Sequence, residues 1–148
     1  MSPEASPADQ AESLFKSGFS CSQAVLAAYA PGLGLDRALA LKIAQPFAGG
    51  TAHTGRMCGA AAGALLVIGL KFGRTEPEDT DAKDKTYALV HRFLDIFREK
   101  HGGLDCPELL GYDLSVQAEM DQAEAEGLFE TLCTPLVRSA AEILQDIL

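Results

Sequence analysis

The sequence of 148 residues has little of what marks nucleic-acid-binding and membrane proteins. Its 12 Lys and Arg residues are outnumbered by 21 Asp and Glu, giving a net charge of −9, and no basic cluster offers the positive surface that a phosphate backbone requires. The small and apolar run at residues 57–70 spans 14 residues, whereas a membrane-spanning helix needs about 20. We therefore expect neither nucleic acid nor a membrane as a partner, and we interpret the run as a buried helix.

Export and haem signals are also missing. The first ten residues, MSPEASPADQ, lack the basic and apolar segments of an export signal, which favours a cytoplasmic location, where thiols stay reduced. No two of the four cysteines form a CxxC pair, and no CxxCH haem site, P-loop, dinucleotide fingerprint or Ser/His/Asp arrangement is present. Four cysteines without haem or structural disulfides need another explanation.

Strand patterns are absent, while helix start and stop signals recur along the chain. The sequence predicts an all-α fold, a single compact bundle of about six helices, with residues 1–148 as one domain and residues 1–6 as a disordered tail. A glycine-rich loop is expected at residues 48–55, where three of eight residues are glycine. Helical segments are expected at residues 8–16, 21–29, 36–47, 58–70, 81–100, 106–110 and 115–126 and from residue 134 onward.

Two of these segments carry apolar residues at helical spacing. Leu39, Ile43 and Phe47 recur every four residues, and Pro46 should end or kink their helix. The segment 81–100 is the strongest amphipathic pattern and closes at a glycine pair. Its apolar positions are Tyr87, Val90, Phe93, Leu94 and Phe97.

Each of the four cysteines falls at an expected helix start. Cys21 follows the capping residue of a Ser-x-x-Gln capping box, Cys58 lies in the first turn of the apolar helix, Cys106 precedes a first-turn proline, and Cys133 precedes a Thr-Pro cap. A helix start presents unpaired N–H groups and the positive end of the helix dipole, which lower the pKa of a thiol. The shared placement favours reactive or ligating thiolates at all four positions.

Three neighbouring residues are weaker candidates for the same site. Gly59 and Gly63 leave little side-chain bulk beside Cys58, so another backbone or an inorganic centre has room to approach. His53, in the glycine-rich loop, is a candidate fourth or replacement metal ligand. The competing interpretation is that the cysteines are unrelated core residues and the small-residue run is a helix-packing seam.

The order of these motifs resembles a known family. Cys21, then Cys58-Gly59-Ala60-Ala61-Ala62-Gly63, then Cys106 and Cys133 resemble the family named for its C, GCAxxG, C, C signature, whose members are described as redox-active. The likeness extends to GFSCSQAVL and GALLVIGLKFG, so it covers nearly the whole chain. The loop departs from the family's form at residues 51–53, where more glycine and an apolar residue are usual. A related module resembles the non-haem part of the split-Soret cytochromes.

The resemblance implies that Cys21, Cys58, Cys106 and Cys133 act as one redox group. A [2Fe–2S] or [4Fe–4S] cluster held by the four thiolates and used for electron transfer is the leading hypothesis. A thiol–disulfide oxidoreductase or redox sensor is the second, and a structural zinc site, Cys₄ or Cys₃His with His53, is the third. No haem is expected, the redox partner protein stays unknown, and a homo-oligomer is left open.

Overall fold

The computed structural model describes residues 5–148, which are mainly helical and contain no β-strand between these limits. The all-α prediction is therefore confirmed, and the described residues form seven helices of eight or more residues, against an expected number of about six. These helices are α1 (Pro7–Lys16), α2 (Cys21–Tyr29), α3 (Arg37–Ala44), α5 (Gly59–Phe72), α6 (Thr80–His101), α8 (Gln117–Ala125) and α9 (Thr134–Ile147). The shorter elements are 3₁₀ turns at Pro31–Leu33 and Gln45–Phe47, α4 (Ala48–Thr51), α7 (Cys106–Leu110) and a π turn at Phe129–Cys133.

The helices begin where the capping residues indicate. Ser6 Oγ accepts a hydrogen bond from the N–H of Asp9, and Pro7 occupies the first helical position of α1. Ser6 is thus the N-cap of α1. Residues 1–4 of the expected tail lie outside the described residues.

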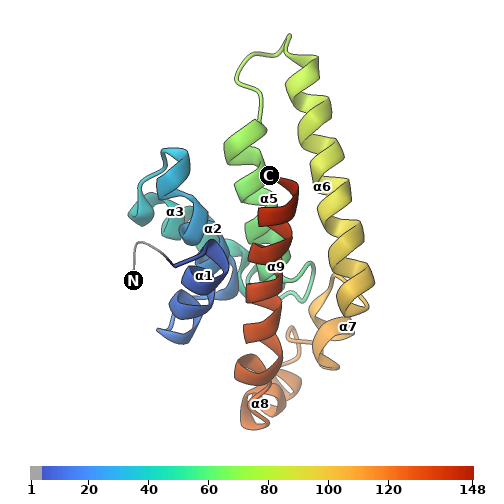
Figure 1. Ribbon diagram of the computed structural model, residues 1–148. Helices are drawn as coiled ribbons and strands as arrows, with labels where there is room; N and C mark the ends of the chain where they lie inside the picture. The colour runs from blue at the N-terminus through green and yellow to red at the C-terminus, as the bar shows by residue number, and fades with distance from the viewer. Residues whose placement is uncertain (1–4) are drawn as a thin grey trace.

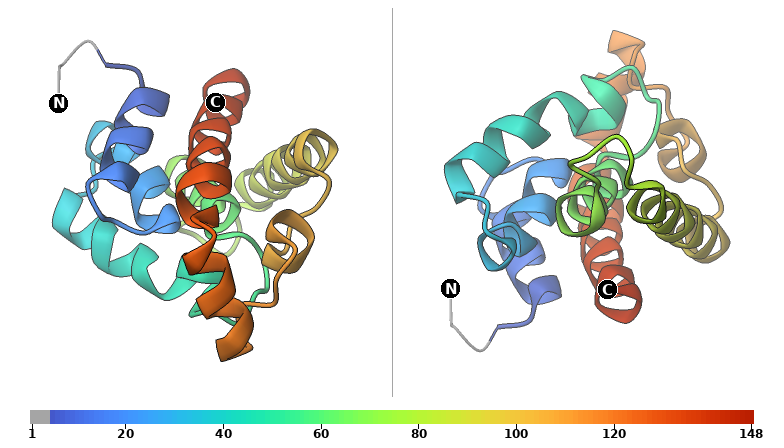
Figure 2. Two further views of the ribbon diagram at one scale, coloured as in Figure 1. Left: turned by 90° about the horizontal axis from the view of Figure 1, so that it is seen from below. Right: turned by 90° about the horizontal axis from the view of Figure 1, so that it is seen from above.

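Helix α5 lies at the centre of the bundle, between α1–α3 on one side and α6 on the other, with α9 across it (Figures 1 and 2). Its first six residues, 59–64, are buried, as the apolar run predicted. A β-carbon on Gly63 would lie only 2.8 Å from the carbonyl oxygen of Ser22, so glycine is needed here for the backbones of α2 and α5 to approach. Gly63 therefore belongs to a helix-packing seam.

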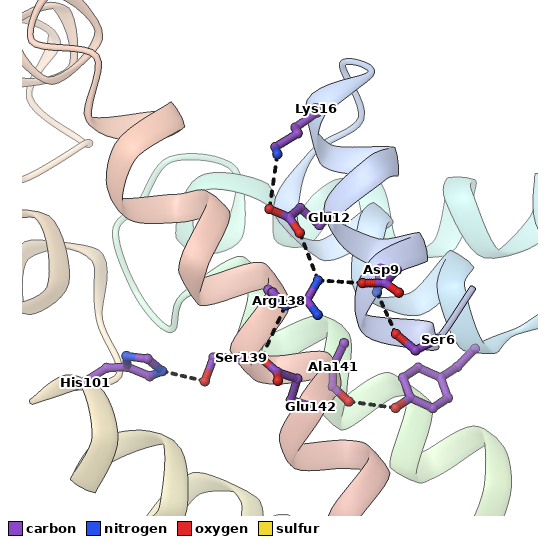
Figure 3. A network of polar contacts seen from close by, with 10 residues as sticks. Ser6, Asp9, Glu12, Lys16, His101, Arg138, Ser139, Ala141 and Glu142 are labelled. Atoms are coloured by element: carbon purple, nitrogen blue, oxygen red, sulfur yellow. Dashed lines mark hydrogen bonds and ion pairs between the residues drawn. The ribbon is translucent and has the colours of Figure 1, made fainter. Parts of the chain in front are cut away.

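Ion pairs connect α1 to α9, and a hydrogen bond connects α6 to α9 (Figure 3). Arg138 on α9 reaches Asp9 Oδ1 at 2.8 Å and Glu12 Oε2 at 2.9 Å, both on α1. His101 Nε2, at the end of α6, lies 2.7 Å from Ser139 Oγ on α9. Since the ion pairs are exposed, we assign most of the stability of this contact to the buried residues Ala8, Ala11 and Leu14 of α1.

The apolar residues spaced along α3 lie on its exposed side. Leu39 and Ile43, at helical spacing, are 51% and 47% exposed, and the buried side of the helix is formed by Ala40 and Ala44. Pro46 does end the helix, because a 3₁₀ turn replaces it from Gln45 onward. Spacing thus identified the helix but not the face that it buries.

Helices α7 and α8 lie together at one end of the bundle, at the bottom of Figure 1. Their apolar residues form a small cluster separate from the main core, built on Cys106, Leu110, Leu114 and Ala123. No helix within residues 5–148 has the length and apolarity to cross a membrane.

The expected glycine-rich loop is a left-handed turn. Five consecutive residues have positive φ: Gly49 at 65°, Gly50 at 72°, Thr51 at 53°, Ala52 at 50° and His53 at 66°. For residues other than glycine this conformation costs roughly 1–2 kcal/mol each, so the last three are strained. The turn brings residues 49 and 53 to the edge of the site described below.

Replacing Ala52 by glycine should remove strain from this turn. We expect Ala52→Gly to raise the free energy of unfolding by about 0.5–1 kcal/mol, because relief of the left-handed strain exceeds the added freedom of the unfolded chain. Urea unfolding followed by circular dichroism measures the change. As the matched control, Ala88→Gly on the exposed side of α6 should lower it by about 1 kcal/mol. Equal losses in both variants would contradict a left-handed Ala52.

Candidate functional site

All four cysteines line one cavity of about 300 Å³ at the α7–α8 end of the bundle. They are free thiols and come from four separate segments of the chain. Cys58 and Cys106 are buried, while Cys21 and Cys133 are partly exposed. The fold thus brings together four cysteines of which each is 27 to 48 positions from the next in the sequence.

Cys21 and Cys58 meet where the starts of α2 and α5 converge. Cys21 is the first residue of α2, behind the capping box of Ser20 and Gln23, and Cys58 is the N-cap of α5. A β-carbon on Gly59 would collide with Cys21 Sγ. Gly59 therefore allows the Cys21 thiol to lie against the first turn of α5, and it lines the cavity itself.

Hydrogen bonds between two loops place Cys58 beside Cys106. The N–H of Cys58 donates to the carbonyl of Leu104, and the N–H of Cys106 donates to the carbonyl of Gly55 at 3.0 Å. Asp105, the N-cap of α7, adds a third bond, because its Oδ1 accepts the N–H of Met57 at 2.6 Å. We call this set the 55–58/104–106 junction.

Cys133 directly precedes the first residue of α9, as the sequence predicted, but it lies within continuous helical structure and not at a free helix start. It has right-handed helical angles and ends the π turn Phe129–Cys133, which continues directly into α9. Pro135 has no N–H to donate, and its ring would clash with the carbonyl four residues back in an α-helical turn. A wider turn avoids this clash, and such π turns are frequent at functional sites.

Of the weaker candidate residues, His53 lies at the cavity and Gly63 lies in the core. His53 lines the cavity, where it packs against Gly49, although its side chain is exposed overall. A β-carbon on Gly49 would overlap the imidazole, so this contact requires glycine. Gly63 lines no part of the cavity and packs on α2.

Burial raises the pKa of every one of the four thiols, which reverses the direction expected from helix starts. The pKa of Cys106 and of Cys133 rises to about 12, mainly because burial disfavours the thiolate. That of Cys58 lies well above its ordinary value for the same reason, and that of Cys21 is also raised. Backbone N–H groups at the starts of α2 and α5 oppose the shift but do not overcome it.

The thiols are near enough to influence one another but too far apart to share one ion. A negative charge on Cys21 raises the pKa of each of the other three. Yet nowhere in residues 5–148 do three Cys, His, Asp or Glu side chains come close enough to hold a single metal ion. Tetrahedral zinc, with bonds of about 2.3 Å, needs its sulfur ligands within about 3.8 Å of each other.

The remainder of the cavity is apolar, which the sequence patterns did not reveal. Among the described residues, no Asp, Glu, Lys or Arg side chain lines it, and its polar lining is Ser20, Gln45 and His53. The apolar side chains come from α1, α7, α8, α9 and their connections, and no spacing within one helix could have identified them. They are Phe15, Leu109, Leu110, Leu114, Met120, Phe129 and Leu136.

The raised pKa values predict slow thiol alkylation and a loss of stability in alkali for the metal-free protein. The stabilisation from protonated Cys106 and Cys133 is fully present below their unfolded pKa of about 8.5 and is lost as the pH rises toward 12. At pH 8, iodoacetamide should react with the folded protein about a hundredfold or more slowly than with the protein in urea. Mass spectrometry follows the reaction. Rates that match those of the unfolded chain would contradict the burial.

Replacing Asp105 should change the alkylation rate of only two of the four thiols. Asp105→Ala removes the acceptor for the Met57 N–H, so alkylation of Cys58 and Cys106 should accelerate severalfold while that of Cys21 and Cys133 stays unchanged. Asp36→Ala is the control, because Asp36 caps α3 in the same manner but away from the cavity. Each lost cap costs about 1 kcal/mol. Acceleration at all four thiols would indicate general unfolding instead.

Comparison with known proteins supplies the family. Residues 19–147 match the family described as "Putative redox-active protein (C_GCAxxG_C_C)". No curated protein and no solved structure matches the chain. The matched range contains all four cavity cysteines and every helix except α1. The chain belongs to the C_GCAxxG_C_C family of redox-active proteins.

Proposed function

We propose that the protein is a small electron-transfer protein in which Cys21, Cys58, Cys106 and Cys133 ligate an iron–sulfur cluster. One observation carries this proposal: thiols from four distant segments line a single cavity. Buried cysteines that served only for packing would have no reason to gather around one space. The matched family is described as redox-active, which supports a redox role for this group.

The donor set fits such a cluster chemically. Iron–sulfur clusters are held by four cysteine thiolates, and N–H groups near the sulfurs help to set their reduction potential. Here the backbone N–H groups of Gly49 and of the first turns of α2 and α5 lie near Cys21 and Cys58. Because no charged side chain among the described residues lines the cavity, these dipoles are the available compensation for the negative charge of the thiolates.

The spacing of the thiols favours a cluster over zinc. A structural zinc ion gathers all four ligands on one atom, and no three candidate ligands in residues 5–148 are close enough for that. In a [4Fe–4S] cluster each ligand binds a different iron atom, and in a [2Fe–2S] cluster two ligands share each iron, so the four sulfurs need not meet at one atom. His53 at the cavity edge adds a nitrogen donor but does not complete a compact set.

The thiol–disulfide alternative has less support. An attacking cysteine needs an accessible thiol with a pKa near the ambient pH, and all four pKa values are raised. Binding a metal reverses this disadvantage, because the bond to the metal stabilises the thiolate and releases the proton.

In this proposal the chain's residues hold and shield the redox group. The four cysteines bind it, the 55–58/104–106 junction sets the distance between two of them, and the apolar lining excludes water. When bound, the cluster would accept and release single electrons. Such a centre suits a reducing compartment, consistent with the expected cytoplasmic location, and requires a redox partner protein.

Anaerobic purification tests the proposal directly. We expect iron and acid-labile sulfide in matching amounts and a visible spectrum that bleaches on reduction. Each single Cys→Ser change at the four positions should lose most of the bound iron, since each ligand is needed. Leu132→Ser is the control: it lies next to Cys133, is exposed and does not line the cavity.

The alternatives give different patterns. Zinc in place of iron would support the structural site. Two sensitive and two tolerant cysteines would support a disulfide pair. Four tolerant positions, with no metal after anaerobic purification, would refute a shared cysteine site.

A further inference from the structure

We propose that the cysteine cavity also binds a small, neutral, predominantly apolar molecule beside Cys106 and Cys133. The binding of this molecule stands on the cavity itself, whereas its position beside a bound cluster rests on the function proposed above.

The position of the site follows from the packing around two of the cysteines. Cys106 and Cys133 belong to the small cluster at the α7–α8 end, together with Leu110, Leu114 and Phe129. Cys21 and Cys58 pack against the main core instead. The apolar part of the cavity lining therefore adjoins Cys106 and Cys133.

The size of the cavity exceeds what thiols alone require. Its volume is about 300 Å³, and an apolar cavity of roughly 150 Å³ is already large enough to hold benzene. Cavities of roughly 300–1,000 Å³ with apolar walls and a few polar groups are typical of small-molecule sites. Gln45 and His53 are exposed and line the cavity, so they mark where it meets solvent.

The charge of the cavity lining indicates which chemical class of molecule the cavity can bind. No Asp, Glu, Lys or Arg from the described part of the chain faces the cavity, so a carboxylate or an ammonium group would be buried without a counter-charge. Ser20, Gln45 and His53 offer hydrogen bonds to one small polar group. A neutral molecule with a mainly apolar body satisfies these conditions.

Binding of fluorobenzene, followed by ¹⁹F NMR, tests this site on the full-length protein. The same sample is measured as purified anaerobically and after metal removal, with its iron and sulfide determined. We expect fluorobenzene to bind in both states. The matched anions and cations, 4-fluorobenzoate and 4-fluorobenzylammonium, should bind at least about tenfold more weakly because of the uncompensated charge.

Two substitutions locate the binding. Met120→Trp should abolish it by filling the cavity, and Met120→Ala should retain it, which covers the case in which the larger side chain prevents folding. Val116→Trp is the matched control, because Val116 is the N-cap of α8 but is exposed and does not line the cavity.

Three results would overturn the inference: no binding of fluorobenzene, equal binding of the charged analogues, or unchanged binding in Met120→Trp. Binding only after metal removal would also overturn it, because the cavity would then serve the cofactor alone. The absence of iron and sulfide would refute the cluster but not the binding site.

Discussion

The site depends on the 55–58/104–106 junction. Without it, nothing but side-chain packing would connect the start of α5 to the start of α7, because α7 belongs to a separate apolar cluster. Three hydrogen bonds, one of them to the carboxylate of Asp105, fix this connection through the backbone. Backbone bonds are insensitive to the identity of most side chains, so the distance between Cys58 and Cys106 is set by the fold.

Holding the four thiols around this cavity is costly, and the costs share one location. Four thiols are held with raised pKa values, and three residues other than glycine adopt left-handed angles in the turn beside them. Strain of this kind persists where the surrounding structure enforces it, typically at functional sites. A ligand that binds the thiolates recovers part of this cost, so the fold and the bound group should stabilise one another.

The sequence predicted the helices because these follow from local signals, whereas the grouping of the cysteines was implied by the family resemblance. Capping boxes and first-turn prolines define helix starts within a few residues, and three of the four cysteines lie at one. Burial is decided by distant segments, so the sequence could not show that Leu39 and Ile43 face solvent or that desolvation outweighs the helix dipole at Cys58. The π turn at Cys133 and the apolar lining also arise from contacts between elements.

The position of Cys106 on α7 determines which parts of the fold a bound group would connect. It is carried by α7, whereas Cys21 and Cys58 belong to the main bundle. Gly102 and Gly127, both with positive φ, flank the segment that contains α7 and α8. A group bound by all four cysteines would therefore add a bond between two parts of the fold that otherwise meet through the junction and a small apolar cluster.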